Sequence, residues 1–189
     1  MIDLNAIFNH KYHRDCQVTA SAPGRLEILG NHTDYNEGVV LSCAVDQRTF
    51  VAAAVNNFRM VRLYDARDNS AAEFCVDLPD NLITPRWANY PAGVISELAA
   101  RNLSVEGFDA VIFSNVPLSA GMSSSAAFET ALLFALKKLF ALDIAPAEAA
   151  RIGQGVENNF LGVKTGLLDQ FSSIFGVENA FILPLQAQF

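Results

Sequence analysis

A loop of small and hydroxyl-bearing residues, V-P-L-S-A-G-M-S-S-S-A-A-F, occupies residues 116–128. The β-branched and aromatic run at 108–115 before it predicts a buried strand, and the composition of 124–140 predicts a helix. The first amides of a helix lack intrahelical partners and carry partial positive charge, so this loop could bind a phosphate group. No Lys follows Gly121, which excludes a Walker A motif, and a simple capped turn is the competing interpretation.

A second segment, residues 25–36, is dense in polar side chains although it lies between two apolar runs. Binding groups concentrate on loops that a rigid scaffold holds, so these side chains could hydrogen-bond a polyol. They are Arg25, Glu27, Asn31, His32, Asp34 and Asn36. The alternative is an Asx-rich turn whose polar groups satisfy one another.

An acidic residue follows a pair of glycines near the end of the chain. Gly162 and Gly166 bracket a predicted turn, and Asp169 falls in the first turn of a helix predicted to end at Gly176. The helix dipole stabilises a carboxylate at this position, so Asp169 could be either a structural or a functional acid.

The secondary-structure elements that must position these segments follow an order along the sequence, with most of the predicted strands in the first half and most of the predicted helices in the second. Strands are predicted at 17–21, where Ala22-Pro23-Gly24 ends the run, and at 39–45, 49–55, 60–64, 72–76 and 179–185. Helices are predicted at 3–13, at 87–101 with a start near Asn89, and at 146–160 with Pro146 at its first position. The short polar breaks favour an antiparallel set of strands. Without regular βαβ alternation, we expect an α+β fold in which a mixed or antiparallel sheet packs with helices.

Composition restricts the class of protein further. The 189 residues are 51% hydrophobic and 17% charged, which predicts a compact globular fold. The net charge is −7 without a basic patch, which disfavours nucleic acid and anionic membranes as partners. Cys16, Cys43 and Cys75 form no C-x-x-C pair, so we expect reduced thiols in or near the core. With no signal-peptide core and no apolar run of about 18 residues, a cytoplasmic location is expected.

Several segments in order resemble the signatures of the galactokinases, within the GHMP small-molecule kinase superfamily. They are residues 24–36 with Gly38, 116–127, 157–162 and 166–170, and residues 45–46 and 87–90 also resemble that family. The resemblance covers nearly the whole chain. It implies that residues 1–189 form a GHMP kinase N-terminal domain with the ribosomal-protein-S5-domain-2-like fold. It also implies a kinase that uses ATP and Mg²⁺ to phosphorylate galactose at its anomeric hydroxyl.

The resemblance assigns a role to each matching position. Arg25 would stabilise charge near the transferring phosphoryl group, and Asp169 would accept or orient the proton of the sugar hydroxyl. The sugar would contact Asn31, His32, Thr33, Asp34 and Gly166. The triphosphate would lie on Ser119, Ala120, Gly121, Met122, Ser123, Ser124 and Ser125. By the same resemblance, magnesium would bind Ser125 and Glu157, and hard oxygen ligands of this kind suit that ion.

Trp87, the sole tryptophan, has two interpretations. The residue type alone favours a core or interface aromatic over a platform on which a base could stack. The resemblance instead implies that Trp87 lies against the adenine of ATP.

The chain departs from the family pattern in two ways. Where the family has G-R-V-N-L-I-G-E-H-T-D-Y-N, this sequence has Glu27 in place of Asn and Asn31 in place of Glu. Asn31 can still hydrogen-bond a sugar but carries no charge. Galactokinases are also much longer than this chain, so we expect a C-terminal domain to be missing and the isolated piece to turn over little substrate.

Two alternatives to a galactokinase remain open. The first is a GHMP kinase that acts on another sugar or an amino sugar, which the exchange at Glu27 and Asn31 allows. The second is a catalytically silent regulator that senses sugar and ATP. The presence of Arg25, Asp169 and a pair of metal-ligand candidates argues against the silent regulator, because a protein that only binds ligands needs no catalytic residues.

Overall fold

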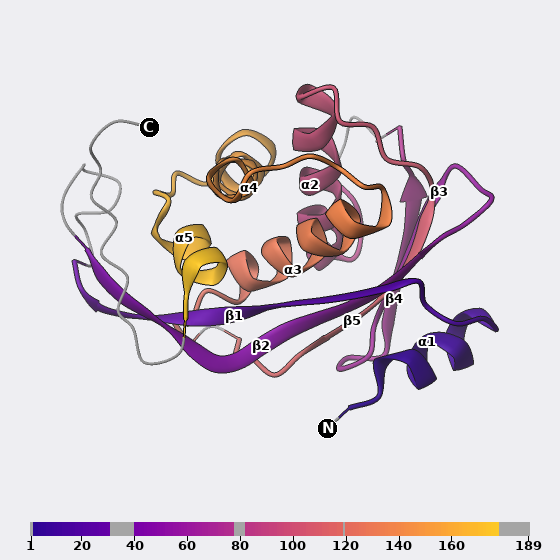
Figure 1. Ribbon diagram of the computed structural model, residues 1–189, viewed down its shortest axis with the longest axis horizontal. Coiled ribbons are helices and arrows are strands. Elements are labelled where there is room, and N and C mark those ends of the chain that lie inside the picture. The colour runs from indigo at the N-terminus through magenta and orange to yellow at the C-terminus, as the bar shows by residue number, and fades with distance from the viewer. Residues whose placement is uncertain (1, 31–39, 78–81, 119, 178–189) are drawn as a thin grey trace.

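The computed structural model describes residues 2–30, 40–77, 82–118 and 120–177. A mixed sheet of five strands, ordered β1-β2-β5-β3-β4, forms its centre, with helices packed against it (Figure 1). The strands are β1 (Val18–Leu29), β2 (Leu41–Val55), β3 (Met60–Asp65), β4 (Ser70–Cys75) and β5 (Phe108–Ser114). The helices are α1 (Leu4–Tyr12), α2 (Asn89–Ala100), α3 (Ser124–Leu139), α4 (Pro146–Gly155) and α5 (Leu168–Phe175), with short turns η2 (Arg86–Ala88) and η3 (Val156–Phe160). The α+β class is confirmed.

Alternating side chains on the central strands divide the core between the two faces of the sheet. Val51 and Ala53 of β2 join the larger core beneath α2, α3 and α4, whereas Ala52 and Ala54 join a smaller core around Phe8 of α1. Successive residues of a strand point to opposite faces, so one strand serves both cores. Figure 1 shows α1 on one side of the sheet and the remaining helices on the other.

The strand β1 continues where the sequence predicted a break. It passes through Ala22-Pro23-Gly24 and carries Arg25 and Glu27, which we had expected in a loop. Because β1 is an edge strand, Pro23 costs no hydrogen bond in a central ladder. The pairing with β2 shifts register between Pro23 and Arg25 and so absorbs the irregularity. Arg25 therefore lies on a rigid strand.

The two strands predicted at 39–45 and 49–55 are one strand, β2, which is 15 residues long. The polar break around Asp46 is not a turn, because β1 runs alongside it and pairs on both sides of the register shift. The sheet is also not wholly antiparallel, since β3 and β5 pair in parallel. The strand predicted at 179–185 lies outside the described residues.

The helix predictions depend on local signals and agree with the structure. The helix α2 begins at Asn89 after the turn η2, and α4 begins with Pro146 at its first position. Asp169 falls in the first turn of α5, whose C-cap is Gly176. Across the described ranges, no helix combines the length and the apolar character needed to cross a membrane.

All three cysteines are free thiols, but they differ in exposure. Cys16 and Cys43 are half-buried, which agrees with a position near the core, whereas Cys75 is exposed. The prediction for Cys75 is wrong because β4 is the other edge strand and alternates its residues between core and solvent.

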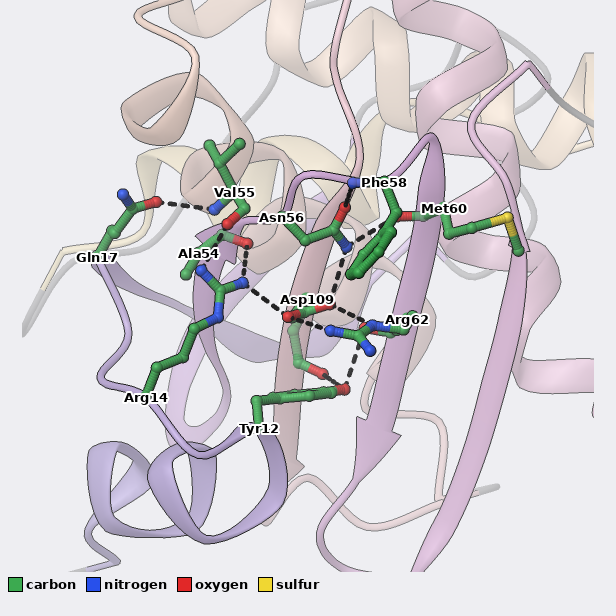
Figure 2. A network of polar contacts seen from close by, with 11 residues as sticks. Tyr12, Arg14, Gln17, Ala54, Val55, Asn56, Phe58, Met60, Arg62 and Asp109 are labelled. Carbon is green, nitrogen blue, oxygen red and sulfur yellow. Dashed lines mark hydrogen bonds and ion pairs between the residues drawn. The ribbon is translucent and has the colours of Figure 1, made fainter.

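A network of hydrogen bonds connects α1 and the segment after it to the sheet (Figure 2). The carboxylate of Asp109 on β5 accepts hydrogen bonds from Arg14 (2.6 Å), Arg62 (2.7 Å) and Asn56 (2.8 Å). Burial acts to raise the pKa of Asp109, but the hydrogen bonds from Arg62, Asn56 and Arg14 outweigh it and hold that pKa below its usual value. We call Asp109 and these three donors the Asp109 network.

Candidate active site

The small-residue loop lies directly against β1. The backbone N–H of Arg25 donates to the Met122 carbonyl at 3.1 Å, and a Cβ atom at Gly24 would lie 2.7 Å from the same oxygen. The loop can approach this closely because position 24 carries no side chain. The Arg25 guanidinium also donates to the Gly121 carbonyl at 2.6 Å. Arg25 on β1 therefore hydrogen-bonds two carbonyl groups of the loop, those of Gly121 and Met122.

Arg25 also joins the loop to the acid predicted as functional. Its Nε and Nη2 lie 2.8 Å and 2.6 Å from Oδ1 of Asp169, which is 144 residues further along the chain. The Ser123 hydroxyl donates to the other oxygen, Oδ2, at 2.6 Å. The Arg25 and Asp169 side chains are 12% and 26% exposed, so the pair is accessible from solvent. We call Arg25, Ser123 and Asp169 the Arg25–Asp169 cluster.

The start of α3 is shaped to leave its amides available. Ser123 is the N-cap residue in a left-handed conformation, with φ 50°, and its hydroxyl does not cap the helix because it is bonded to Asp169. Among the described residues, the amides of the first turn therefore have no capping side chain, which is the usual condition for anion binding at a helix N-terminus. Ala120 and Gly121 are exposed and residues 122–125 are half-buried. Ser119 lies outside the described residues.

A second group of oxygen atoms lies beside the first turn of α3. The Ser125 hydroxyl donates to Oε1 of Glu157 at 3.1 Å, and the Gln170 amide donates to Oε2 at 3.3 Å. Glu157 lies in η3, a π-helical turn that follows α4, and π-helical turns occur frequently at functional sites. The nearby Glu129 carboxyl is buried, and burial together with the negative charge of Glu157 raises the pKa of Glu129 well above its usual value.

The donor set of Ser125 and Glu157 fits Mg²⁺ in kind. A hydroxyl and a carboxylate are hard oxygen ligands, and Mg²⁺ is usually held by one or two protein carboxylates while phosphate and water complete its shell. Within the described ranges, no group of three or more His, Cys, Asp or Glu side chains is arranged so that it could hold a metal ion. Ser125 and Glu157, the two predicted ligands, contact each other. By themselves they would supply only part of the coordination shell of a magnesium ion.

The remaining predicted residues are placed less closely. Gly166 is half-buried in the segment before α5, next to Thr165, whose N–H donates to Asn158 at 2.9 Å. The Trp87 indole N–H donates to Ser70 at 3.0 Å, and its ring packs against Phe128 with centroids 6.4 Å apart. Trp87 therefore lies at the margin of the larger core. Asn31, His32, Thr33 and Asp34 lie outside the described residues.

Sequence reasoning missed the buried polar pair of Glu129 and Gln170. A signal was available, because Glu129 is the single acidic residue in the otherwise apolar and small-residue run of α3 before its terminal lysines. An acid in such a helix either faces solvent or has a polar neighbour in the core. The polar neighbour of Glu129 is Gln170 of α5, which lies far along the chain, so no local sequence pattern could predict it.

The comparisons with known proteins agree with this geometry. Residues 89–177 match the model of the GHMP kinases N terminal domain, so the loop, Glu157 and Asp169 lie in a domain of that class. Residues 6–55 match the galactokinase galactose-binding signature. The chain is therefore galactokinase-like within the GHMP kinases.

Solved structures support the same assignment. The galactokinase of Lactococcus lactis, crystallised with galactose, is 31% identical, with a TM-score of 0.81 over 91% of this chain. This chain spans 45% of the length of that protein. The Methanococcus jannaschii mevalonate kinase (18% identity, 88% of this chain, 53% of that protein, TM-score 0.76) shares the fold. So does a D-glycero-D-manno-heptose 1-phosphate kinase from Bacteroides thetaiotaomicron (18% identity, 88% and 58% covered, TM-score 0.72).

Proposed function

We propose that this chain provides the phosphate-binding and catalytic part of a galactokinase, which transfers the γ-phosphoryl group of ATP to the anomeric hydroxyl of galactose. The products are galactose 1-phosphate and ADP. The observation that carries the proposal is the contact of Arg25 with both Asp169 and the Gly121 carbonyl, because it brings the predicted catalytic pair to the edge of the predicted phosphate loop. The galactose-binding signature at 6–55 supports galactose as the sugar.

Each residue of the Arg25–Asp169 cluster has a role that its contacts support. Phosphoryl transfer needs positioning and the neutralisation of spreading charge more than covalent chemistry, and the Arg25 guanidinium supplies positive charge beside the loop. Asp169 accepts bonds on both of its oxygens, from Arg25 and from Ser123. Because both oxygens already accept hydrogen bonds, Asp169 is better placed to orient the sugar hydroxyl than to remove its proton.

The other predicted groups complete the proposal. The backbone amides at the start of α3 bind the phosphates, and Mg²⁺, held by Ser125 and Glu157, neutralises phosphate charge when it is bound. Asn31, His32, Thr33, Asp34 and Gly166 contact the sugar, and Trp87 lies at the adenine. This chain spans 45% of the Lactococcus lactis galactokinase, and the remainder of a protein of that length would complete the enclosure of the substrates and exclude water.

The exchange of Glu27 and Asn31 favours a second candidate, a GHMP kinase for another sugar or an amino sugar. Glu27 lies on β1 two residues from Arg25, and its Oε2 is 3.9 Å from Arg25 Nη2. Its Oε1 is buried and has no hydrogen-bond partner among the described residues, so it could accept a bond from a sugar hydroxyl or ammonium group.

A coupled assay of ADP release by the full-length protein, against a panel of monosaccharides and amino sugars, tests the proposal. We expect galactose to give the highest kcat/KM. A higher value for another sugar would establish the second candidate. Saturable binding of sugar and ATP without ADP release would instead identify a silent sensor and overturn the proposed kinase activity.

A further inference from the structure

Two polar side chains meet in the core where α3, α4 and α5 pack together. Glu129 of α3 is 1% exposed and Gln170 of α5 is 0% exposed. Both lie against Gly153 of α4, where a Cβ atom would be 2.7 Å from Gln170 Cγ and 3.4 Å from Glu129 Oε2. A glycine at the helix contact therefore gives the carboxyl and the amide the space that they occupy.

If Glu129 is ionised, the Glu129–Gln170 pair has more hydrogen-bond acceptors than donors. Gln170 Nε2 donates to Glu157, but Gln170 Oε1 and both oxygens of Glu129 have no donor among the described residues. A carboxylate and an amide oxygen are both acceptors, so an ionised Glu129 cannot supply the donor that Gln170 Oε1 lacks. A single proton on Glu129, donated to Gln170 Oε1, gives both residues a partner.

The surroundings determine which of the two carboxyl groups holds that proton. Burial, followed by the negative charges of Glu157 and Asp169, raises the pKa of Glu129, and the contact with Gln170 opposes this only in part. Glu157 by contrast accepts hydrogen bonds from both Ser125 and Gln170, so each of its oxygens already has a donor. The proton therefore belongs to Glu129.

We propose that Glu129 is a neutral acid that orients the Gln170 amide, and that Gln170 in turn positions the Glu157 carboxylate beside Ser125. The bonds run from Glu129 O–H to Gln170 Oε1, then from Gln170 Nε2 to Glu157 Oε2. If the amide were turned over, its oxygen would face the Glu157 carboxylate and repel it. Glu129 and Gln170 are positioning residues, and their effect on magnesium depends on the proposed function, whereas the hydrogen-bond chain does not.

Infrared spectroscopy of the full-length protein tests the protonation of Glu129 without substrate. A protonated carboxyl group has a C=O stretch at a higher frequency than an ionised one. We expect the difference spectrum between the wild type and Glu129→Gln near neutral pH to contain this band, contributed by the wild type. Its absence would overturn the assignment of Glu129 as a neutral acid.

Substitutions test the positioning of Glu157. Glu129→Gln keeps the shape and a donor for Gln170 Oε1, whereas Glu129→Leu keeps the bulk and removes the donor. We expect Glu129→Leu to weaken Mg²⁺ affinity by about 10-fold or more, as is typical when a residue that orients a metal ligand is lost. Affinity is measured by titrating Mg²⁺ against the protein with the analogue AMP-PNP. We expect Glu129→Gln to retain most of the wild-type affinity.

A control separates positioning from loss of stability. Leu132 lies on the same helix, is fully buried and belongs to the larger core, so Leu132→Ala should lower Tm without weakening Mg²⁺ affinity. Equal weakening in Leu132→Ala and Glu129→Leu, or in Glu129→Gln and Glu129→Leu, would overturn the positioning role. If the wild type bound AMP-PNP with no dependence on Mg²⁺, the proposed metal site and the positioning role would both fail. The infrared band would still decide separately whether Glu129 is protonated.

Discussion

Asp109 and Asp169 both pair with arginines, but they lie on opposite faces of the sheet and their surroundings differ. Asp109, on the α1 face, accepts bonds from Arg14, Arg62 and Asn56 and has no exposed side-chain surface. Asp169, on the face covered by α3 and α5, accepts bonds from Arg25 and Ser123 and is 26% exposed. The first carboxylate is saturated and enclosed, whereas the second can be reached by another molecule.

The same type of ion pair therefore stabilises the fold in one place and, under the proposed function, takes part in chemistry in another. In the Asp109 network, Arg14 comes from the segment after α1, Asn56 from the segment after β2 and Arg62 from β3, so each bond connects a different part of the chain to β5 (Figure 2). In the Arg25–Asp169 cluster, the ion pair adjoins the uncapped start of α3. Substitution of Asp169 should therefore affect turnover, whereas substitution of Asp109 should affect stability.

The largest expected effect is the loss of turnover when Asp169 is replaced by Asn. We expect kcat of the full-length protein to fall by about 1000-fold with Tm little changed, because the sugar hydroxyl loses the group that orients it. The coupled ADP assay measures the loss. A fall of only a few-fold would exclude both the orienting and the proton-accepting role. A large loss with a solvent isotope effect near unity would favour orientation.

Asp109→Asn should instead lower the stability of the protein and leave its turnover unchanged. Removal of one partner of a buried ion pair costs about 3 kcal/mol, because two arginines lose their common acceptor. We expect a lower free energy of unfolding in urea and an unchanged kcat per folded molecule. A substantial loss of kcat at full occupancy of the native state would contradict the separation of the two clusters.

The cost of Asp109→Asn should also depend on pH. Because the folded-state pKa of Asp109 is lowered, its ionised form stabilises the native protein above the ordinary aspartate pKa of about 3.9, and this contribution disappears as the pH falls through the folded value. We expect the difference in unfolding free energy between wild type and Asp109→Asn to be full at neutral pH and to shrink in acid. A constant difference down to the acid limit would show that Asp109 does not act through its charge.

Gly24→Ala tests the contact between β1 and the loop. The added Cβ would lie 2.7 Å from the Met122 carbonyl, so the loop must move. Overpacking of this kind costs about 1–3 kcal/mol, and the displaced loop should raise KM for ATP. Thermal unfolding and the ATP dependence of the assay measure the two effects. Gly162→Ala is a control for glycine replacement, since no atom lies within 4 Å of its hypothetical Cβ and only its positive φ of 70° opposes the substitution.

The smallest expected effect belongs to Asn31→Glu, which restores the usual family residue. We expect KM for the sugar to change more than KM for ATP, because position 31 is predicted to contact the sugar. Equal changes in both KM values would contradict that assignment.

The parts of the fold that could be predicted are those with local causes. Pro146 and Asp169 indicate helix starts by their own chemistry: α4 begins at Pro146, and Asp169 lies in the first turn of α5. The continuation of β1 through Pro23 could not be predicted, because it depends on β1 being an edge strand, which is a property of the whole sheet. Exposure of Cys75 has the same cause, since β4 forms the opposite edge.

The candidate site shows the same division. The types and spacing of Arg25 and Asp169 suggested chemistry, and the family resemblance suggested their proximity, but the 144 residues between them hide the contact from any local pattern. The bond from Ser123 to Asp169 and the burial of Glu129 beside Gln170 arise only when α3, α4 and α5 pack together. Tertiary contacts therefore determine which polar residues of the sequence become partners.

The two bonds of Arg25, to the Gly121 carbonyl and to Asp169, have a consequence for the energetics of binding. A single side chain on a strand already holds the loop and the start of α5 in register with each other. The conformational entropy of bringing these distant segments together is lost when the protein folds, so a nucleotide that bound as we propose would not have to compensate for it. The site is preorganised by the same sheet that gives the chain its stability.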